Sequence, residues 1–211
     1  MNPATKRHET VELSKEVFVD RLRDMFYEAD AAAYVPYIID RAYRGDYAPA
    51  GRMVEVWTDT TWRGQSTGLN LSVTCAEDVP FITESEIAKT SAGSFIGDTR
   101  VRAQQRACSI WNVTPVSSEY QTPVHSTAPI LMTSGTDDPA TPPQYGTEAL
   151  RYLPNARQIL IPHAGHDQEL DCEDDLIVKF VRTRNAKTLD ATKCAGTSLR
   201  PPFATSMKGF P

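Results

Sequence analysis

The sequence predicts an α/β fold in its C-terminal part and a mostly helical region before it. Apolar residues recur at helical spacing up to about residue 121, whereas two short apolar runs, each followed by a polar loop and a helix, come later. A strand–helix–strand–helix order implies a parallel sheet, because parallel strands need a crossover connection. The predicted division is a helical domain, 1–121, and an α/β domain, 122–211.

Helices are expected at three places in the first domain. The first runs from Val11 to Ala29, where apolar residues lie close to helical spacing. The second covers Ala31 to Tyr43, and the third spans Asp98 to Ile110. The stretch from Leu69 to Thr74 alternates like a strand in helical surroundings, so its structure stays open.

The spacing of apolar residues along the chain changes after a proline-rich connector that begins near residue 114. Pro129 to Ser134 is a short apolar run of the kind that forms a buried parallel strand. A helix is expected to open at residues 141–144, with Thr141 as its cap. Arg157 to Ile161 is the second predicted strand. The last helix should run from about Glu173 to Arg184, with acids first and bases last, as the helix dipole favours.

Composition argues against several classes of partner. The 211 residues carry a net charge of -5 with no Lys/Arg-rich block, so nucleic acid is not expected. No apolar run is long enough to cross a bilayer, so no membrane is expected either.

The polar N-terminus lacks the apolar core of a signal peptide. Either the protein is cytosolic, or the chain begins downstream of its true start.

The four cysteines form an even set with no close C-x-x-C pair: Cys75, Cys108, Cys172 and Cys194. A metal site is therefore not expected, and nothing in the sequence indicates a cofactor. Two readings remain open. The cysteines are either four unrelated buried thiols or two disulfides, and disulfides would imply an oxidising, extracellular or periplasmic location.

Polar clusters follow both predicted strands. S-G-T-D-D-P comes after the first and H-A-G-H-D after the second. Loops at the carboxyl ends of parallel strands share one edge, and neighbouring strands lie about 5 Å apart, so an acid can reach a histidine there. A buried carboxylate that accepts the Nδ1 proton leaves Nε2 as a general base. The alternative, a capping aspartate and a surface histidine, explains each residue singly but not the two together.

Two long motifs resemble a known family. They are A-P-I-L-M-T-S-G-T-D-D-P-A-T-P-P-Q-Y-G and L-P-N-A-R-Q-I-L-I-P-H-A-G-H-D. Both are similar to the end of α/β-hydrolases of the tripeptidyl- and prolyl-aminopeptidase-like branch. The family's acid stands directly before the proline of D-P-x-T-P-P, which selects Asp138 over Asp137. Its histidine stands in G-H-G or a similar motif, which selects His166 over His163, although Asp167 replaces the usual small residue.

The resemblance extends over nearly the whole chain. The segment G-L-N-L-S-V-T-C-A-E-D-V-P-F and residues 31–49 look like the helical cap of that branch. The resemblance, with the even cysteine count, implies the disulfides Cys75–Cys108 and Cys172–Cys194. It also suggests Glu77 and Asp78 as cap acids that hold a substrate's α-ammonium group. The alternative for these two acids is a solvated helix end.

The resemblance implies a serine hydrolase that cleaves short peptides from the N-terminus, with small esters as alternative substrates. Its nucleophile would stand in a G-x-S-x-G elbow between a strand and a helix. One such motif surrounds Ser66, but residues 58–63 do not resemble a buried strand. We therefore expect a C-terminal part that lacks the nucleophile and whose partner is the N-terminal half of the fold. The alternatives are an esterase that uses Ser66 and an inactive truncated or non-enzymatic binding protein.

Overall fold

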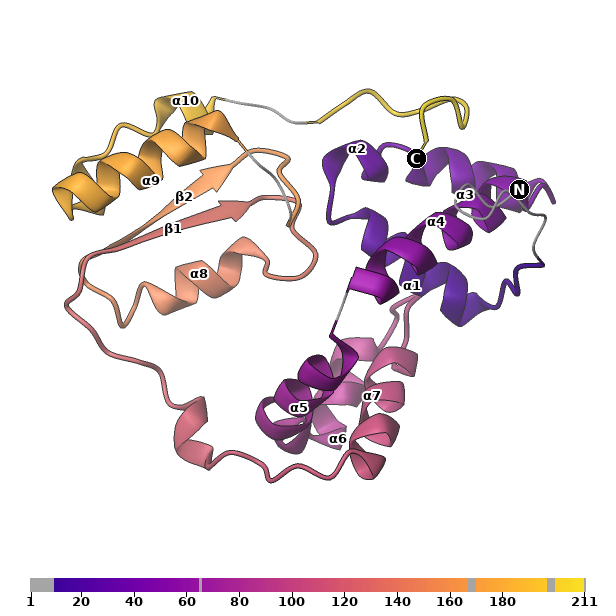
Figure 1. The fold of residues 1–211 in the computed structure, drawn as a ribbon, viewed down its shortest axis with the longest axis horizontal. Coiled ribbons are helices and arrows are strands. Elements are labelled where there is room, and N and C mark those ends of the chain that lie inside the picture. Colours follow the sequence, from indigo (N-terminus) through magenta and orange to yellow (C-terminus); the bar gives the residue numbers. More distant parts are fainter. Residues whose placement is uncertain (1–9, 65, 167–169, 197–199, 211) are drawn as a thin grey trace. The chain divides into compact units, whose positions relative to one another are not determined.

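The computed structural model describes residues 10–64, 66–166, 170–196 and 200–210 (Figure 1). The described chain is mostly helical and contains a two-stranded parallel sheet, which confirms the predicted fold class. The first part consists of helices: α1 (Lys15–Met25), α2 (Ala29–Ala32), α3 (Val35–Tyr43), α4 (Ala48–Gly64), α5 (Thr67–Glu77), α6 (Glu84–Ser91) and α7 (Thr99–Ile110). The second part contains β1 (Ile130–Gly135), α8 (Pro143–Ala149), β2 (Ala156–Ile161), α9 (Asp171–Thr183) and α10 (Thr192–Ala195).

Several boundaries differ from the sequence prediction. The first helix is shorter at both ends than the predicted Val11 to Ala29. The predicted helix from Ala31 to Tyr43 is divided into α2 and α3, with a proline in the first turn of α3. Proline lacks an N–H and fits the first turn of a new helix better than the middle of a longer one. The ambiguous stretch from Leu69 to Thr74 is helical and belongs to α5.

Close contacts divide the chain into two compact units. The first unit contains the described residues up to Leu22 together with Ala50–Thr122, and the second contains Arg23–Pro49 and Pro123 onward. The domain division predicted from the sequence, a helical domain at 1–121 and an α/β domain at 122–211, rests on sequence pattern rather than on contacts. That division stays a prediction.

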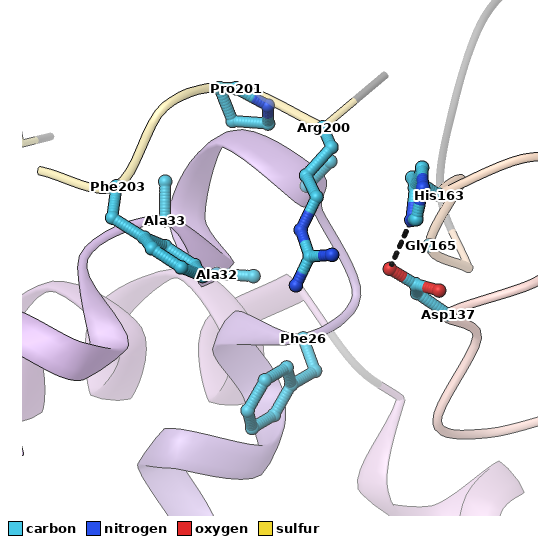
Figure 2. A pocket seen from close by; sticks show the side chains of 10 residues that line it. Phe26, Ala32, Ala33, Asp137, His163, Gly165, Arg200, Pro201 and Phe203 are labelled. Atoms are coloured by element: carbon cyan, nitrogen blue, oxygen red, sulfur yellow. Dashed lines mark hydrogen bonds and ion pairs between the residues drawn. The ribbon is translucent and has the colours of Figure 1, made fainter. Parts of the chain in front are cut away.

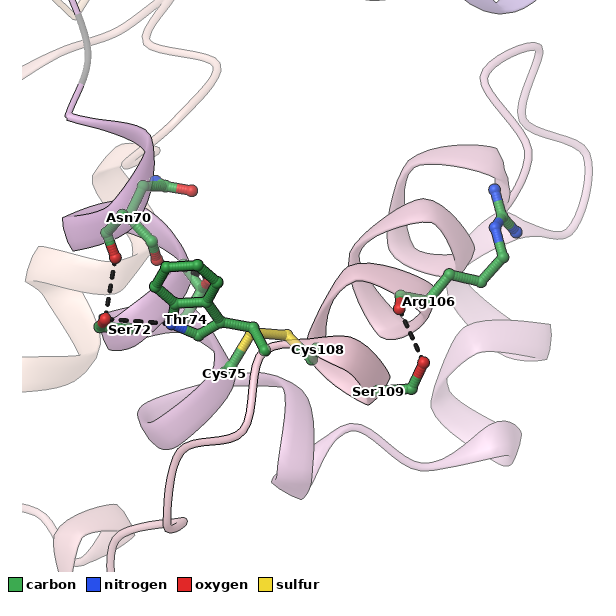
Figure 3. Close-up of a disulfide and its surroundings, with 9 residues drawn as sticks. Asn70, Ser72, Thr74, Cys75, Arg106, Cys108 and Ser109 are labelled. Atoms are coloured by element: carbon green, nitrogen blue, oxygen red, sulfur yellow. Dashed lines mark hydrogen bonds between the residues drawn. A yellow bond between two sulfur atoms is a disulfide. The ribbon is translucent and has the colours of Figure 1, made fainter.

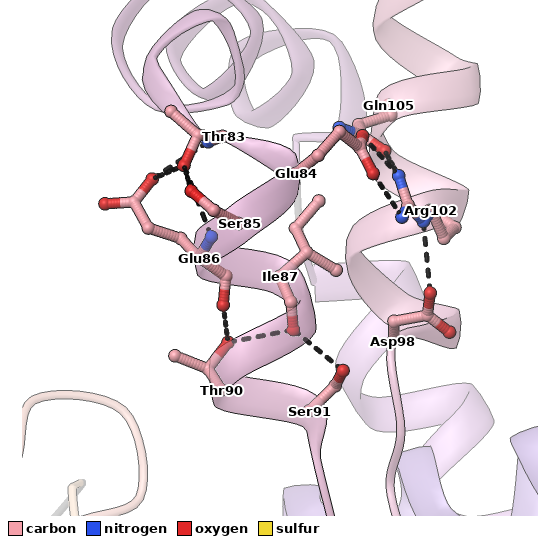
Figure 4. Close-up of polar contacts among 10 residues, drawn as sticks. All are labelled: Thr83, Glu84, Ser85, Glu86, Ile87, Thr90, Ser91, Asp98, Arg102 and Gln105. Atoms are coloured by element: carbon pink, nitrogen blue, oxygen red, sulfur yellow. Dashed lines mark hydrogen bonds and ion pairs between the residues drawn. The ribbon is translucent and has the colours of Figure 1, made fainter.

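In the first unit, the helices from α5 to α7 are joined covalently and by ion pairs. The disulfide Cys75–Cys108 connects α5 to α7 (Figure 3). Arg102 of α7 donates to both carboxylate oxygens of Glu84 at 2.6 and 2.7 Å (Figure 4). The start of α6 is closed by a capping box, in which Thr83 and Glu86 satisfy each other's backbone N–H groups. These links hold the three helices as one module.

In the second unit, β1 and β2 pair in parallel, from Ile130 opposite Ala156 to Gly135 opposite Ile161. Figure 1 shows α8 on one face of this sheet and α9 with α10 on the other. The core between β2, α9 and α10 is apolar, and its buried members are Ile159, Ile161, Ala164, Cys172, Leu176, Leu189, Ala191 and Cys194. The sheet and its core therefore fix the carboxyl ends of both strands.

The second disulfide, Cys172–Cys194, joins α9 to α10 inside this core. Both pairings implied by the family resemblance are therefore confirmed, and no described cysteine is free. None of the helices in the described ranges is long and apolar enough to span a bilayer.

Candidate active site

The loops that follow β1 and β2 are bonded to each other at the same edge of the sheet. The backbone N–H of Thr136 donates to the carbonyl of Ile161 at 3.1 Å, and that of Asp137 donates to Ala164 at 3.0 Å. In return, the N–H of His163 donates to the Thr136 hydroxyl at 2.8 Å. The acid-bearing loop and the histidine-bearing loop therefore meet, as the strand order predicted.

Two glycines allow the backbone to approach closely around the histidine-bearing loop. A Cβ atom at Gly135 would overlap the carbonyl groups of Ala164 and Gly165, and one at Gly165 would overlap the carbonyl of Tyr27. The next residue, His166, donates its backbone N–H to that same Tyr27 carbonyl at 2.8 Å. The Tyr27 ring also meets the His166 ring edge-on, with centroids 5.0 Å apart. Backbone and ring contacts together orient His166.

Asp138 and His166 are hydrogen-bonded. Nδ1 of His166 lies 3.0 Å from Oδ2 and 3.2 Å from Oδ1 of the carboxylate. The Asp138 side chain is only 6% exposed, while that of His166 is 32% exposed. The carboxylate also accepts the N–H groups of Ala140 at 2.8 Å and Thr141 at 2.9 Å, and the Thr141 hydroxyl at 2.8 Å. Asp138 is thus a buried acid whose lone pairs are occupied.

Burial alone would raise the pKa of Asp138, because it disfavours the charged form. Hydrogen bonds from Thr141, His166 and Ala140 outweigh burial and lower the pKa from 3.8 to about 2. At neutral pH the carboxylate is therefore ionised and can only accept, so the hydrogen of the contact must reside on Nδ1 of His166. Among the described residues nothing hydrogen-bonds to Nε2, which leaves this atom available as a base.

Thr141 links the members of this pair. Besides donating to Asp138, its hydroxyl oxygen lies 3.3 Å from Nδ1 of His166. The sequence pattern predicts that Thr141 caps the following helix, and that prediction is wrong. Helix α8 begins at Pro143, after Pro142 as its N-cap residue, without a side-chain cap bond. The threonine instead supports the carboxylate, which a capping pattern alone could not reveal.

Thr141→Val should raise the pKa of Asp138 above about 2, because one bond to the charged form is lost. The pKa should remain below 3.8, since both backbone bonds persist. Because the pKa of Asp138 is lowered in the fold, ionisation of this carboxylate stabilises the folded protein above pH 3.8, and the stabilisation is lost as the pH falls through about 2. In the valine variant the stabilisation should be lost at a higher pH. Carboxyl ¹³C NMR titration measures the change. Thr141→Ser keeps the hydroxyl and is the control, and an unchanged pKa in the valine variant would contradict the role.

A second His–Asp pair stands beside the first. Nδ1 of His163 lies 3.2 Å from Oδ2 of Asp137, and the side chains are 37% and 51% exposed. Asp137 also accepts the Thr136 hydroxyl at 3.1 Å. His163 has a positive φ of 57°, a sparsely populated conformation for a residue other than glycine. Within the described residues, no backbone N–H group donates to the Asp137 carboxylate, in contrast to Asp138.

A small polar cavity of about 140 Å³ surrounds the buried pair. Its lining includes Ser134, Asp138, Thr141, His166 and Glu173, all from the second unit. This space gives solvent or substrate access to the histidine ring. No group of three or more His, Cys, Asp or Glu residues in the described part of the chain is arranged to hold a metal ion.

Ser66 does not stand in a nucleophile elbow. It is the N-cap residue of α5, and the element before it is the long helix α4 rather than a strand. Its backbone, at φ −75° and ψ 90°, is in an ordinary extended region. An elbow needs a sharp, strained turn between strand and helix, so the G-x-S-x-G pattern around Ser66 lacks the required setting.

Glu77 and Asp78 lie at the end of α5 in the first unit. The Tyr120 hydroxyl donates to the Glu77 carboxylate at 2.5 Å, and this bond raises the pKa of Tyr120. Gln121 also donates to the Glu77 carbonyl at 3.2 Å. Asp78 is exposed. Glu77 thus has a local partner, and the role of both acids in substrate binding stays a prediction.

The family model of TAP-like proteins, a group of α/β-hydrolases, matches residues 93–194. The matched segment contains β1, β2, Asp138 and His166. No curated protein and no solved structure matches the chain significantly.

Proposed function

Because this chain belongs, through residues 93–194, to the TAP-like α/β-hydrolases, we propose that Asp138 and His166 are the acid and base of a Ser-His-Asp triad. The observation that supports this best is the buried, ionised Asp138 bonded to Nδ1 of His166 at the carboxyl ends of two parallel strands. The proposed reaction is hydrolysis of short peptides from the N-terminus through a serine ester. Hydrolysis of small esters would use the same steps.

In this reaction Nε2 of His166 accepts the serine hydroxyl proton while the serine oxygen bonds to the substrate carbonyl carbon. Asp138 stabilises the imidazolium that forms and keeps the ring oriented through Nδ1. Nε2 then gives the proton to the departing amine as the tetrahedral intermediate collapses to the acyl-serine. Water, deprotonated by the same nitrogen, releases the acid and regenerates the serine.

We propose that the serine and the oxyanion donors belong to an upstream segment of the hydrolase fold, because the motif around Ser66 joins two helices. Within the described residues β1 is bonded only to β2, so its other edge can accept a further strand. An upstream parallel strand there would bring its own carboxyl end to the same edge as His166. The upstream half of the fold is thus the proposed partner.

Two further features agree with a secreted peptidase. Glu77 and Asp78 are proposed to hold the α-ammonium group of the peptide, for which a carboxylate is suited. The two disulfides fit an oxidising compartment, because such bonds persist outside the cytosol. We therefore propose an extracellular or periplasmic location.

The proposed function is tested by turnover of aminoacyl-arylamides and short-acyl nitrophenyl esters. The chain shown here should be inactive alone and should gain activity when an upstream segment with a G-x-S-x-G elbow is supplied, covalently or in trans. Activity of the chain alone that is abolished in Ser66→Ala would overturn the assignment of the nucleophile. Absence of turnover in the assembled form would instead indicate a non-enzymatic binding protein of the same fold.

A further inference from the structure

A larger cavity, of about 300 Å³, adjoins the acid–base pair within the second unit. It is mostly apolar, with Phe26, Ala32, Ala33 and Phe203 in its lining. Gly165, the residue directly before His166, lines both this cavity and the small polar one. Whatever occupies the larger cavity therefore lies next to the histidine loop.

The C-terminal tail forms one wall, and named contacts hold this wall in place. The N–H of Ala204 donates to the carbonyl of Ala33 at 3.0 Å, and the Tyr34 hydroxyl donates to the carbonyl of Lys208 at 2.9 Å. The Tyr34 ring meets the Phe210 ring edge-on at 5.1 Å, and Phe210 is buried. The tail thus packs against the α2–α3 segment and places Arg200 and Phe203 at the cavity.

Among the residues that line the cavity, Arg200 carries a permanent positive charge. Asp137 and His163, on the opposite wall, are paired with each other at 3.2 Å. Arg200 has no ion pair with any residue in the described ranges, and its guanidinium lies 5.5 Å from the centroid of the Phe203 ring. Figure 2 shows its side chain extending into the space between Phe26 and the Asp137–His163 pair. A planar guanidinium binds a carboxylate well, because its N–H groups can form two parallel hydrogen bonds to the two oxygens.

We propose that this cavity binds the apolar C-terminal residue of a short peptide. The free carboxylate bonds to Arg200, and the side chain packs against Phe26 and Phe203. The rest of the peptide extends past Gly165 toward His166. This inference rests on the proposed hydrolase function and deepens it, because a peptide held at its free C-terminus beside the catalytic pair can have only a short segment between the cleaved bond and that C-terminus.

The test compares two matched ligands by calorimetric titration of the full chain. N-acetyl-phenylalanine carries the carboxylate, whereas N-acetyl-phenylalaninamide has the same shape without the charge. We expect the acid to bind about tenfold more tightly, as a charge-assisted hydrogen bond of about 1.4 kcal/mol would give. Arg200→Gln should remove this difference. Arg182→Gln, at an exposed position near the end of α9, is the control and should keep it.

Phe26→Ala should weaken both ligands about equally, because it removes apolar contact and no charge. Phe26 is already 41% exposed, so the fold should tolerate the change. Equal affinity of the acid and the amide, or full binding by Arg200→Gln, would overturn the inference. Binding requires no nucleophile, so these results are independent of turnover. If the assembled enzyme is active but binds the acid and the amide equally, the inference about the cavity is refuted and the hydrolase proposal stands. If the assembled enzyme is inactive but binds the acid more tightly, only the hydrolase proposal is refuted.

Discussion

Asp138→Asn should lower kcat of the assembled enzyme by about four orders of magnitude, the loss typical when a triad histidine is held in the wrong tautomer. The native carboxylate can only accept, so it keeps the hydrogen on Nδ1 of His166. An asparagine amide can donate to Nδ1, which transfers the ring hydrogen to Nε2 and removes the base. The measurement is kcat for an aminoacyl-arylamide at neutral pH, with the fold checked by circular dichroism.

Asp137→Asn is the matched comparison, since it makes the same change one residue away. Its side chain is half exposed and pairs with His163, so its loss should reduce kcat far less. The two variants separate the role of a triad acid from a general effect of negative charge at this edge. Near-normal turnover by Asp138→Asn, or an equal loss in both variants, would show that another acid holds the role.

The sheet edge could be predicted from the sequence because its signals are local. A short apolar run followed by a polar loop indicates where a buried strand ends, and both strands end within a residue or so of the expected position. The parallel order then requires the Asp138 and His166 loops to meet. Their hydrogen bond was therefore a consequence of topology, although their catalytic role stays a prediction.

The choice between neighbouring acids could not be derived from spacing. Asp137 and Asp138 each face a histidine from the second loop, at 3.2 and 3.0 Å. Only the structure shows that one carboxylate is buried and surrounded by donors while the other is exposed. The family motif selected Asp138, and burial gives a physical reason for that selection.

The role of Thr141 was missed for a related reason. A threonine before two prolines satisfies the sequence pattern of a helix cap. Its hydroxyl has a single hydrogen, so it can donate to one acceptor at a time. Which acceptor it takes depends on where the tertiary fold places a carboxylate.

Removal of the Cys172–Cys194 disulfide should produce a large loss of stability. The bond closes a loop of 22 residues, and the chain-entropy model assigns about 3 kcal/mol to a loop of this length. Both cysteines are also buried in the core beside β2, at 5% and 1% exposure. Cys172→Ala with Cys194→Ala avoids placing hydroxyl groups in this core, so the measured loss reflects mainly the lost link.

Urea unfolding of the oxidised chain and of the double variant measures the difference. Cys75→Ala with Cys108→Ala is the comparison: it removes a link across 33 residues in the other unit and should leave the carboxyl NMR titration of Asp138 unchanged. The Cys172–Cys194 variant should disturb that titration as well, because α9 and α10 pack against the strand that positions His166. Unfolded but unreduced wild-type protein should expose no free thiol. Four titratable thiols, or equal stability of the double variant, would show that α9 and α10 are held by apolar packing alone.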